Sequence, residues 1–351
     1  MQSKINNPFN ISFGEKPINF IPRSNEAERI INSFTSENPE SKAFVLTGPR
    51  GSGKTVFLSE IRSTFSNKEN WLAVNLNPYG DMLEQLCASI YEHGKTKHLF
   101  LTFDFNFSFK GLGFSIRGKE PVSNVQTLLE KMLTYLRKKD TKVLITVDDV
   151  TNNQNMKYFI HAYQSLIADK FNVFLLMTGL YENISEIEND KGLTFFIRAP
   201  KVHLDKLSLI AISNSYAKIF KIDLDNAIKL SKITMGYAYG YQLLGNLLFN
   251  NNIKLDSELL AEFDFALENN VYSLIWKTLS KKDKEILTFI AEGATTNEEI
   301  KKRTGLENPA LQVYKSRLSK AGLIDTSLRG KCVLSLPRFK EYIQMQKKLA
   351  E

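Results

Sequence analysis

The chain has 351 residues, of which 43% are hydrophobic and 24% are charged. This apolar share can bury cores and excludes a chain that is disordered throughout, and the length fits two or three domains of about 100–200 residues. No run of about 18 apolar residues occurs, so we expect no membrane-spanning helix. The formal charge is +8, and nearly all of it lies in residues 276–351, where 16 lysines and arginines stand against 9 acids. A basic segment on a near-neutral body suggests a polyanionic partner, although a solvated lysine-rich surface has the same composition.

Cysteine and histidine usage excludes two further classes of protein. Cys87 and Cys332 are too far apart in the sequence for a disulfide framework, and the four histidines have no paired metal-ligand spacing. The first residues lack the apolar stretch of a signal peptide. We therefore expect a reduced, cytoplasmic protein.

Short apolar runs and helical periods alternate through the first half of the chain. The apolar runs predict buried strands at 43–47, 71–76, 143–147 and 173–177. Capping residues and periodic apolar positions predict helices near 24–34, 54–65, 81–92, 123–138 and 155–168. Strands that alternate with helices predict an α/β fold, with a parallel sheet covered by helices on both faces.

Residues 99–117 interrupt this alternation. Phe103, Phe105, Phe107 and Phe109 occupy every second position, which is the period of a strand with one buried face. Glycines at 111 and 113 supply a turn, so we expect an inserted β-hairpin. We expect the rings to pack on the body of the domain, and stacking on nucleic-acid bases is the alternative.

From about residue 207 the pattern is purely helical. Apolar periodicity predicts helices at 208–220, 223–234, 238–249 and 256–268, and a separate segment begins near 279. We therefore expect an α/β domain at 1–205, a helical domain at 206–275 and a basic domain at 276–351.

Residues 48–55 match the phosphate-binding pattern G-x-x-x-x-G-K-[ST] in full. A predicted strand ends just before them and a predicted helix opens at Lys54, which argues against a glycine-rich turn that matches by chance. Loop glycines let backbone N–H groups converge on phosphate oxygens at a helix N-terminus. We expect Lys54 to reach the β- and γ-phosphates and the Thr55 hydroxyl to bind Mg²⁺. The expected nucleotide-binding residues of this loop are Gly48, Pro49, Arg50, Gly51, Ser52, Gly53, Lys54 and Thr55.

Two acids follow the predicted strand at 143–147. We expect the carboxylate of Asp148 to hold Mg²⁺ and that of Asp149 to orient the attacking water. The alternative is a loop in which Asp149 caps a helix.

Two further residues are candidate contacts of a nucleotide. Thr178 follows the strand at 173–177, at the sheet edge where ligands of open α/β folds bind, and is either a γ-phosphate sensor or a turn residue. Arg198 is a lone cation in an apolar stretch. It either contacts a nucleotide, in its own or a neighbouring subunit, or forms a salt bridge.

The order of these features resembles that of prokaryotic P-loop ATPases of the AAA+/STAND kind, near the archaeal-type ATPases and origin initiators. In that comparison residues 48–55 are Walker A, residues 144–149 are Walker B and Thr178 is sensor 1. The resemblance implies that the sensor-1 strand lies between the two Walker strands, and that Arg23, in a box where Pro22 replaces the usual glycine, lies on the adenine side. Residues 236–242 occupy the place of sensor 2 in the family's helical lid, without its arginine.

This resemblance implies ATP or ADP and Mg²⁺ as cofactors. Many active members carry Asp-Glu at Walker B, whereas Asp148 is followed here by a second aspartate, as in the STAND switches, which are slow hydrolysers. The shorter side chain also matters because catalytic positioning is sensitive at a scale of about 1 Å. We therefore expect slow ATP hydrolysis.

The basic segment has the pattern of three helices and a hairpin between about 279 and 345, which resembles a winged helix. In such folds the third helix enters the major groove and the hairpin meets the DNA backbone. The candidate DNA contacts are Gln312, Lys315, Ser316 and Lys320 on the third helix, and Arg329 and Lys331 in the hairpin. Winged helices also serve as protein-interaction or lid modules, so these residues do not decide between DNA and protein as the partner.

The sequence as a whole predicts a nucleotide-controlled switch that binds double-stranded DNA. The alternative is a STAND-like signalling or defence ATPase whose winged helix contacts protein, and either form admits a homo-oligomer. A kinase is disfavoured because no base for an acceptor hydroxyl is visible.

Overall fold

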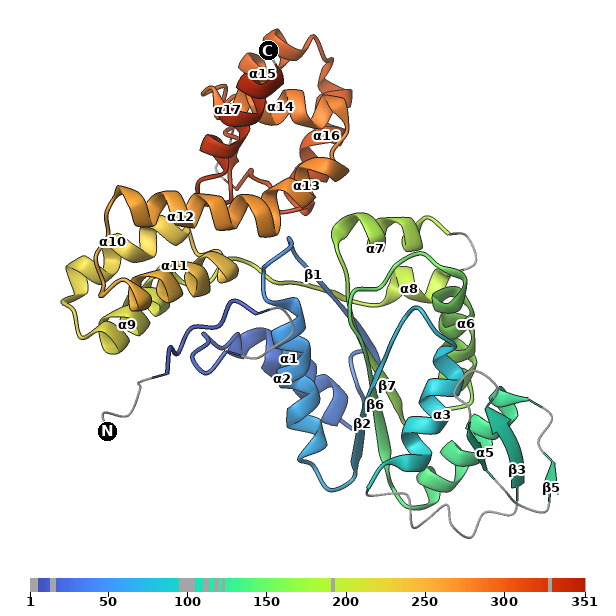
Figure 1. Ribbon diagram of the computed structural model, residues 1–351. Helices are drawn as coiled ribbons and strands as arrows, with labels where there is room; N and C mark the ends of the chain where they lie inside the picture. The colour runs from blue at the N-terminus through green and yellow to red at the C-terminus, as the bar shows by residue number, and fades with distance from the viewer. Residues whose placement is uncertain are drawn as a thin grey trace. The chain divides into compact units, whose positions relative to one another are not determined.

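The computed structural model describes residues 6–12, 17–94, 105–109, 114–116, 120–121, 124–190, 193–327 and 330–350. The chain forms two compact units (Figure 1). The first, which we call the sheet unit, comprises Arg23–Thr47 and Lys54–His203. The second, the helical unit, comprises Met1–Pro22, Gly48–Gly53 and Leu204–Glu351. None of the described helices is long and apolar enough to cross a membrane.

A parallel sheet of five strands forms the centre of the sheet unit. Its order is β2 (Trp71–Leu76), β6 (Lys142–Val147), β7 (Val173–Thr178), β1 (Ala43–Thr47) and β8 (Lys201–His203). Every residue of β1 and β7 is buried, as expected for central strands of a parallel sheet. The four strands predicted from apolar runs are therefore confirmed. The three-residue β8 was not predicted.

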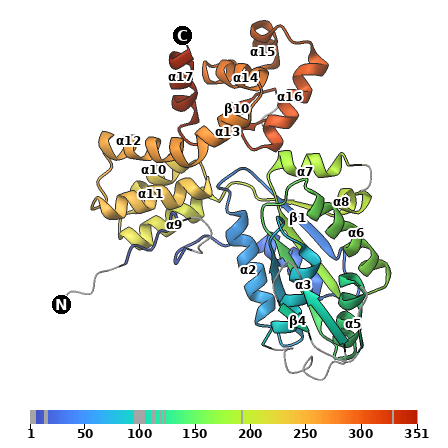
Figure 2. The same cartoon turned by 45° about the vertical axis from the view of Figure 1, so that its right-hand side comes forward.

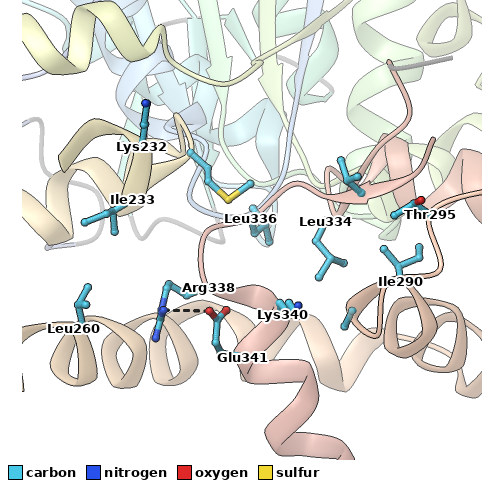
Figure 3. Close-up of a pocket in the computed structure, with 14 residues that line it drawn as sticks. Lys232, Ile233, Leu260, Ile290, Thr295, Leu334, Leu336, Arg338, Lys340 and Glu341 are labelled. Atoms are coloured by element: carbon cyan, nitrogen blue, oxygen red, sulfur yellow. Dashed lines mark ion pairs between the residues drawn. The ribbon is translucent and has the colours of Figure 1, made fainter. Parts of the chain in front are cut away.

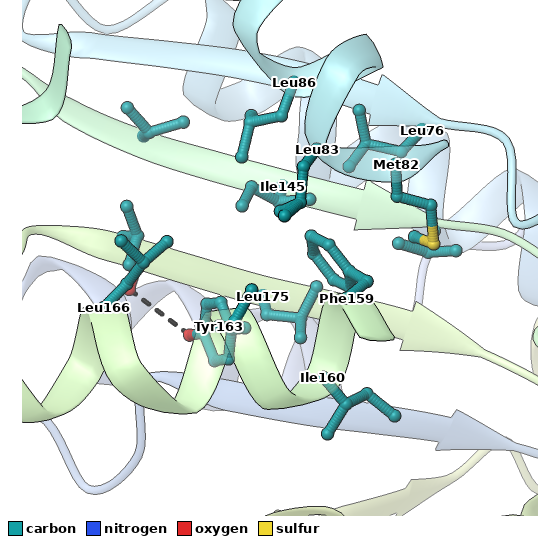
Figure 4. Close-up of a cluster of buried hydrophobic side chains, with 14 of the residues drawn as sticks. Leu76, Met82, Leu83, Leu86, Ile145, Phe159, Ile160, Tyr163, Leu166 and Leu175 are labelled. Atoms are coloured by element: carbon teal, nitrogen blue, oxygen red, sulfur yellow. Dashed lines mark hydrogen bonds between the residues drawn. The ribbon is translucent and has the colours of Figure 1, made fainter. Parts of the chain in front are cut away.

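Helices cover both faces of this sheet (Figures 1 and 2). On one face, α1 (Ser24–Thr35) and α2 (Lys54–Ser66) enclose an aromatic cluster with the strands, comprising Phe34, Phe44, Phe65, Trp71 and Phe174. On the other face lie α3 (Met82–Glu92), α5 (Val125–Lys138) and α6 (Gln154–Ala168). Their buried side chains pack on alternate residues of the same strands, including Ile145 and Leu175 (Figure 4).

The helices on the second face begin at capping residues. Asp81, Asn124 and Asn153 accept hydrogen bonds from the first backbone N–H groups of α3, α5 and α6. Two short helices, α7 (Tyr181–Glu188) and α8 (Thr194–Arg198), complete the unit before β8. Tyr163 of α6 donates from its hydroxyl to the carbonyl of Lys42, just before β1 (2.8 Å), which ties the helix to the sheet.

The strands of the inserted hairpin are present as predicted. β3 (Phe105–Phe109) pairs antiparallel with β4 (Phe114–Ile116), and β5 (Glu120–Pro121) pairs parallel with β3. The expected turn at 111–113 and Phe103 lie outside the described residues, as do the side chains of the strands. Packing of the phenylalanines on the domain body therefore stays a prediction.

The helical unit contains the four predicted helices as α9 (Leu209–Phe220), α10 (Leu224–Thr234), α11 (Ala238–Asn250) and α12 (Ser257–Leu267). A π-helical turn, η1 (Glu268–Tyr272), joins α12 to the short α13 (Ser273–Thr278). The basic segment follows with α14 (Lys281–Ala291), α15 (Asn297–Thr304), α16 (Asn308–Lys320), the antiparallel pair β9 (Ile324–Asp325) and β10 (Val333–Leu334), and α17 (Phe339–Ala350). One apolar core runs through all of these elements, so the expected boundary near residue 275 stays a prediction.

Candidate nucleotide-binding site

The phosphate-binding pattern lies on a loop between β1 and α2, as the sequence predicted. Its three glycines have positive φ values of 151° at Gly48, 75° at Gly51 and 91° at Gly53. At Gly51 a side chain is also excluded by space, since an added Cβ would lie 2.1 Å from the hydroxyl oxygen of Tyr237. The last two residues of the loop, Lys54 and Thr55, open α2, where the helix dipole favours an anion. Lys54 is buried, with 9% of its surface exposed.

The carboxyl ends of three neighbouring strands meet at one edge of the sheet. β7 lies between β6 and β1, so the strand that carries Thr178 lies between the two Walker strands, as the resemblance implied. The N–H of Gly179 donates to the carbonyl of Leu46 (3.1 Å), which joins the end of β7 to the end of β1. Ligands of open α/β sheets bind along this edge.

Asp148, Asp149 and Thr178 form one hydrogen-bonded group at that edge. The Thr178 hydroxyl is fully buried, donates to Oδ1 of Asp148 and accepts from the N–H of Asp149 (2.9 Å). The N–H of Val150 donates to the carbonyl of Thr178 (2.8 Å). Thr178 is therefore more than a turn residue, because its side chain fixes the orientation of the first acid and the backbone of the second.

Asp149 adopts an uncommon backbone conformation, with a φ of +56°. Left-handed geometry is tolerated by aspartate better than by most residues, and residues held in it cluster at functional sites. Here the hydrogen bonds of Asp149 and Val150 to Thr178 hold the turn in place. The exposed side chain of Asp149 is thereby presented at the sheet edge, and it does not cap a helix; the cap of α6 is Asn153.

The oxygen donors at this edge suit a magnesium ion. Mg²⁺ takes one or two protein oxygens and completes its shell with water and substrate phosphates. Thr55 offers a hydroxyl at the start of α2, and Asp148 offers a carboxylate after β6. Within the described parts of the chain no three His, Cys, Asp or Glu side chains form a metal cluster.

Comparison with known proteins agrees with this geometry. Residues 23–177 match the model of the KAP family P-loop domain. The chain contains a P-loop NTPase domain. Residues 269–343 match a second family model, described as a domain of unknown function (DUF8462). No curated protein matches the sequence.

Solved structures resemble the whole chain, beyond its P-loop NTPase domain. A Walker-type ATPase of Pyrococcus abyssi is 14% identical, with a TM-score of 0.62 over 94% of this chain and 97% of the other. The ORC2 protein of Aeropyrum pernix, in its ADPNP–ADP complexes, is 14% identical, with a TM-score of 0.59 over 97% and 98% of the two chains. At 14% sequence identity the similarity to these structures establishes the fold of the chain.

The two predicted arginines lie at different places in the sheet unit. Arg23 immediately precedes α1, and its contact with a nucleotide stays a prediction. Arg198 is exposed at the end of α8, and no acidic partner for it occurs among the described residues. α8 leads into the amino end of β8, whereas the phosphate loop follows the carboxyl end of β1. A contact of Arg198 with a nucleotide, in its own or a neighbouring subunit, stays a prediction.

Two tyrosines missed by sequence reasoning contact the phosphate loop within the helical unit. The Tyr237 hydroxyl donates to the carbonyl of Arg50 (2.6 Å), and the N–H of Tyr239 donates to the carbonyl of Gly51 (3.0 Å). Burial raises the pKa of Tyr237, so its hydroxyl keeps its proton and remains a donor. The sequence signals were tyrosine at alternate positions of the segment 236–242 and the place of this segment, where the resembling family carries sensor 2.

The candidate DNA contacts differ in their accessibility. Gln312, Ser316 and Lys320 are exposed and lie four residues apart, along one face of α16, and Lys331 is exposed beside β10. Lys315 differs because it is buried, with 8% of its surface exposed, and its ammonium group donates to Oδ1 of Asn297 (2.5 Å). This placement disfavours Lys315 as a DNA contact. Arg329 lies outside the described residues.

A cavity of about 470 Å³ lies elsewhere in the helical unit (Figure 3). Its walls come from α10, α12, α14, β10 and the start of α17, and the ion pair of Arg338 with Glu341 (3.1 Å) borders it. No residue of the phosphate loop lines it. The cavity is therefore separate from the nucleotide-binding site.

Proposed function

We propose that the protein binds Mg·ATP at the phosphate loop, hydrolyses it slowly and uses the bound nucleotide to control its basic C-terminal segment. The observation that carries the proposal is the buried Thr178 hydroxyl, which joins both acids after β6 in one group at the sheet edge. The ADPNP–ADP complexes of the similar Aeropyrum pernix ORC2 protein support adenine nucleotides as the ligand.

Each residue of the site has a role in this proposal. Bound Mg²⁺ would neutralise charge on the β- and γ-phosphates. Lys54 would contact the same phosphates, and Thr55 and Asp148 would hold the metal. Asp149 orients the attacking water, and hydrolysis is slow because its carboxylate is one methylene shorter than that of the more usual glutamate.

Lys54→Ala and Asp149→Asn test these roles separately. Lys54→Ala removes the cation that contacts the phosphates and should abolish detectable binding of a fluorescent ATP analogue. Asp149→Asn should bind ATP as the wild type does and lose turnover in a phosphate-release assay. Unchanged turnover in Asp149→Asn would remove Asp149 from its role.

The chain offers a close control for each variant. Asp140→Asn changes another exposed aspartate with a positive φ (+50°), which precedes the opposite end of β6. Lys131→Ala removes an exposed lysine from α5. Both controls should keep binding and turnover at wild-type levels.

A chain of contacts within the helical unit supports control of the C-terminal segment. Pro49 of the phosphate loop lies against Gly322, where an added Cβ would come within 2.8 Å of Pro49 Cδ. On a second route, the side-chain amide of Asn270 in η1 donates to the Tyr239 hydroxyl (2.9 Å). In the same turn the Tyr272 hydroxyl donates to the carbonyl of Pro337, just before α17. A change in the loop therefore has two routes to the C-terminal elements.

We further propose that this segment is a winged helix that binds double-stranded DNA. Three helices followed by an antiparallel strand pair have the order of that fold. The exposed residues Gln312, Ser316 and Lys320 form a polar stripe on its third helix, and the segment carries nearly all of the net charge of the chain. Lysine contacts with phosphate dominate affinity for DNA and make it dependent on salt.

Charge reversal tests the DNA contacts. Lys320→Glu and Lys331→Glu should each weaken binding to a DNA duplex by about tenfold and reduce the salt slope by roughly 1. Lys348→Glu, near the end of α17, makes the same change of charge at another exposed lysine and should have a smaller effect. Equal affinity in all three variants would contradict DNA binding by α16 and the hairpin.

The contact between Pro49 and Gly322 favours a second candidate function. In a STAND-like signalling ATPase the C-terminal module would act as a lid or bind a protein, and the protein would work as a homo-oligomer in which Arg198 meets the nucleotide of a neighbour. Nucleotide-dependent self-association without duplex binding would support this function over the first.

A further inference from the structure

Consecutive peptide groups of the phosphate loop are held from the helical unit at two points. The Tyr237 hydroxyl donates to the carbonyl of Arg50 (2.6 Å), and the N–H of Tyr239 donates to the carbonyl of Gly51 (3.0 Å). Tyr237 is 3% exposed, so its hydroxyl has little access to water as an alternative partner. Gly51 has a φ of +75° and no room for a side chain against the Tyr237 ring. The backbone of Gly51 therefore packs directly against the buried side chain of Tyr237.

These bonds orient the amide groups of the loop as well as its carbonyls. In a trans peptide the N–H of the next residue points away from the carbonyl, and no cis peptide bond occurs among the described residues. When the Arg50 carbonyl points at Tyr237, the N–H of Gly51 points away from that tyrosine. Likewise, the N–H of Ser52 points away from Tyr239 and donates to the carbonyl of Pro49 (3.1 Å). The Tyr237 contact thus fixes the direction of the Gly51 N–H, an amide that a phosphate would use, whereas the Ser52 N–H is bonded within the loop.

We infer that Tyr237 and the backbone of Tyr239 form a latch that positions the phosphate loop for nucleotide binding. The inference rests on the proposed nucleotide-binding function and adds Tyr237 as a positioning residue of that site. The latch occupies the segment where the resembling family carries a charged sensor 2. Here neutral donors act on the loop backbone, so the latch works through Arg50 and Gly51.

Tyr237→Phe tests the latch because it removes the hydroxyl and keeps the ring. A buried hydrogen bond of this kind is typically worth a factor of about 3–10 in an equilibrium, so affinity for a fluorescent ATP analogue should fall by that factor. Tyr216→Phe is the matched control: its buried hydroxyl also donates to a backbone carbonyl, that of Tyr241 (2.8 Å), away from the loop. The affinity of Tyr216→Phe for the analogue should stay within twofold of the wild type. This change is smaller than the loss expected when a hydrogen bond that acts on the site is removed.

Hydrogen exchange gives a second measurement that needs no nucleotide. The N–H of Tyr239 is protected by its bond to Gly51, and in Tyr237→Phe this amide should exchange faster than in Tyr216→Phe. Circular dichroism and a thermal melt would check that both variants fold.

The outcomes separate the latch from the proposed function. Weaker nucleotide binding and faster exchange in Tyr237→Phe alone would support the latch. If the wild type binds the nucleotide analogue and Tyr237→Phe binds it as tightly as Tyr216→Phe does, the latch is overturned and the proposed function stands. A wild-type protein without affinity for adenine nucleotides would overturn the proposed function, and with it the role of the latch.

Discussion

The Thr178 hydroxyl donates its one proton to Asp148 and is fully buried. A hydroxyl has a single hydrogen, so in this arrangement Thr178 cannot also donate to a phosphate. The same hydroxyl accepts a hydrogen bond from the N–H of Asp149 (2.9 Å). We therefore expect Thr178 to act by holding Asp148, the proposed magnesium ligand, in place, which is a more indirect role than that of the γ-phosphate sensor suggested by the sequence.

Substitutions at Thr178 should separate its hydroxyl from its shape. Thr178→Val keeps the volume and removes the hydroxyl, so Asp148 loses its orienting bond and Mg²⁺-dependent ATPase activity should fall about 10–100-fold. Thr178→Ser keeps the hydroxyl and should retain most of the activity. Steady-state phosphate release measured across Mg²⁺ concentrations checks both variants, with a higher Mg²⁺ requirement expected for the valine. An equal loss of ATPase activity in Thr178→Val and Thr178→Ser would mean that the packing of the threonine side chain, and not its hydroxyl, supports activity.

An ion pair in the C-terminal segment should be needed for stability and not for DNA binding. The guanidinium of Arg317 donates to both carboxylate oxygens of Asp283 (2.5 and 2.6 Å), and Asp283 is 3% exposed and also accepts from the N–H of Ser280, the N-cap of α14. Arg317→Ala leaves this carboxylate buried without its cation and should lower the free energy of unfolding by about 1–3 kcal/mol. Chemical denaturation measures the loss. Lys302→Ala, an exposed lysine on α15, is the control and should change stability by less than about 0.5 kcal/mol.

The parts of the site that the sequence predicted are those encoded locally. The glycine loop with Lys54 and Thr55 follows a buried apolar strand, and both features lie within about a dozen residues of sequence. The two acids at 148–149 likewise follow directly after a buried apolar strand, at 143–147. Strand ends meet at one edge of a parallel sheet, so local patterns were enough to bring the acids to the phosphate loop's edge.

The features that the sequence could not predict depend on distant contacts. Tyr237 bonds to Arg50 across 187 positions, and no local pattern encodes such a pair. β8 has only three residues and is recognisable as a strand only through its pairing with β1. Lys315 was predicted as a DNA contact, but its side chain is buried and its ammonium group bonds to Asn297 on α15.

Alkaline pH should unfold the protein before its buried tyrosines ionise. Burial raises the pKa of several tyrosines above the ordinary value of 10.0, and four of them donate to a backbone carbonyl: Tyr163, Tyr216, Tyr237 and Tyr272. Above pH 10 the unfolded chain loses these protons while the folded chain keeps them. The stabilisation is therefore complete below pH 10 and falls as pH rises, by about 1.4 kcal/mol per pH unit for each tyrosine.

Tyrosinate absorbance recorded beside circular dichroism checks this expectation. The absorbance of the buried group should rise together with the loss of helix, in one transition above pH 10. A rise in the absorbance of all tyrosines while the helical signal is intact would contradict the buried positions of these hydroxyls.

The N-terminal segment should stabilise the helical unit through the ring of Phe9, which packs against Gly245. Phe9 is 3% exposed and contacts Tyr216, Phe220 and Tyr241, with ring centroids 5.9, 5.5 and 5.6 Å away. An added Cβ at Gly245 of α11 would lie 2.4 Å from this ring. Phe9→Ala should therefore lower the free energy of unfolding by about 3–5 kcal/mol, and Gly245→Ala should also destabilise because it displaces the ring.

The double variant distinguishes a specific contact from two independent losses. Once Phe9→Ala has removed the ring, Gly245→Ala meets no obstacle, and alanine is favoured over glycine within a helix by about 0.8–1.0 kcal/mol. The double variant should therefore be at least as stable as Phe9→Ala alone, as measured by urea denaturation. Additive losses would show that Gly245 is required for a reason other than the Phe9 ring, because residues in direct contact are expected to couple.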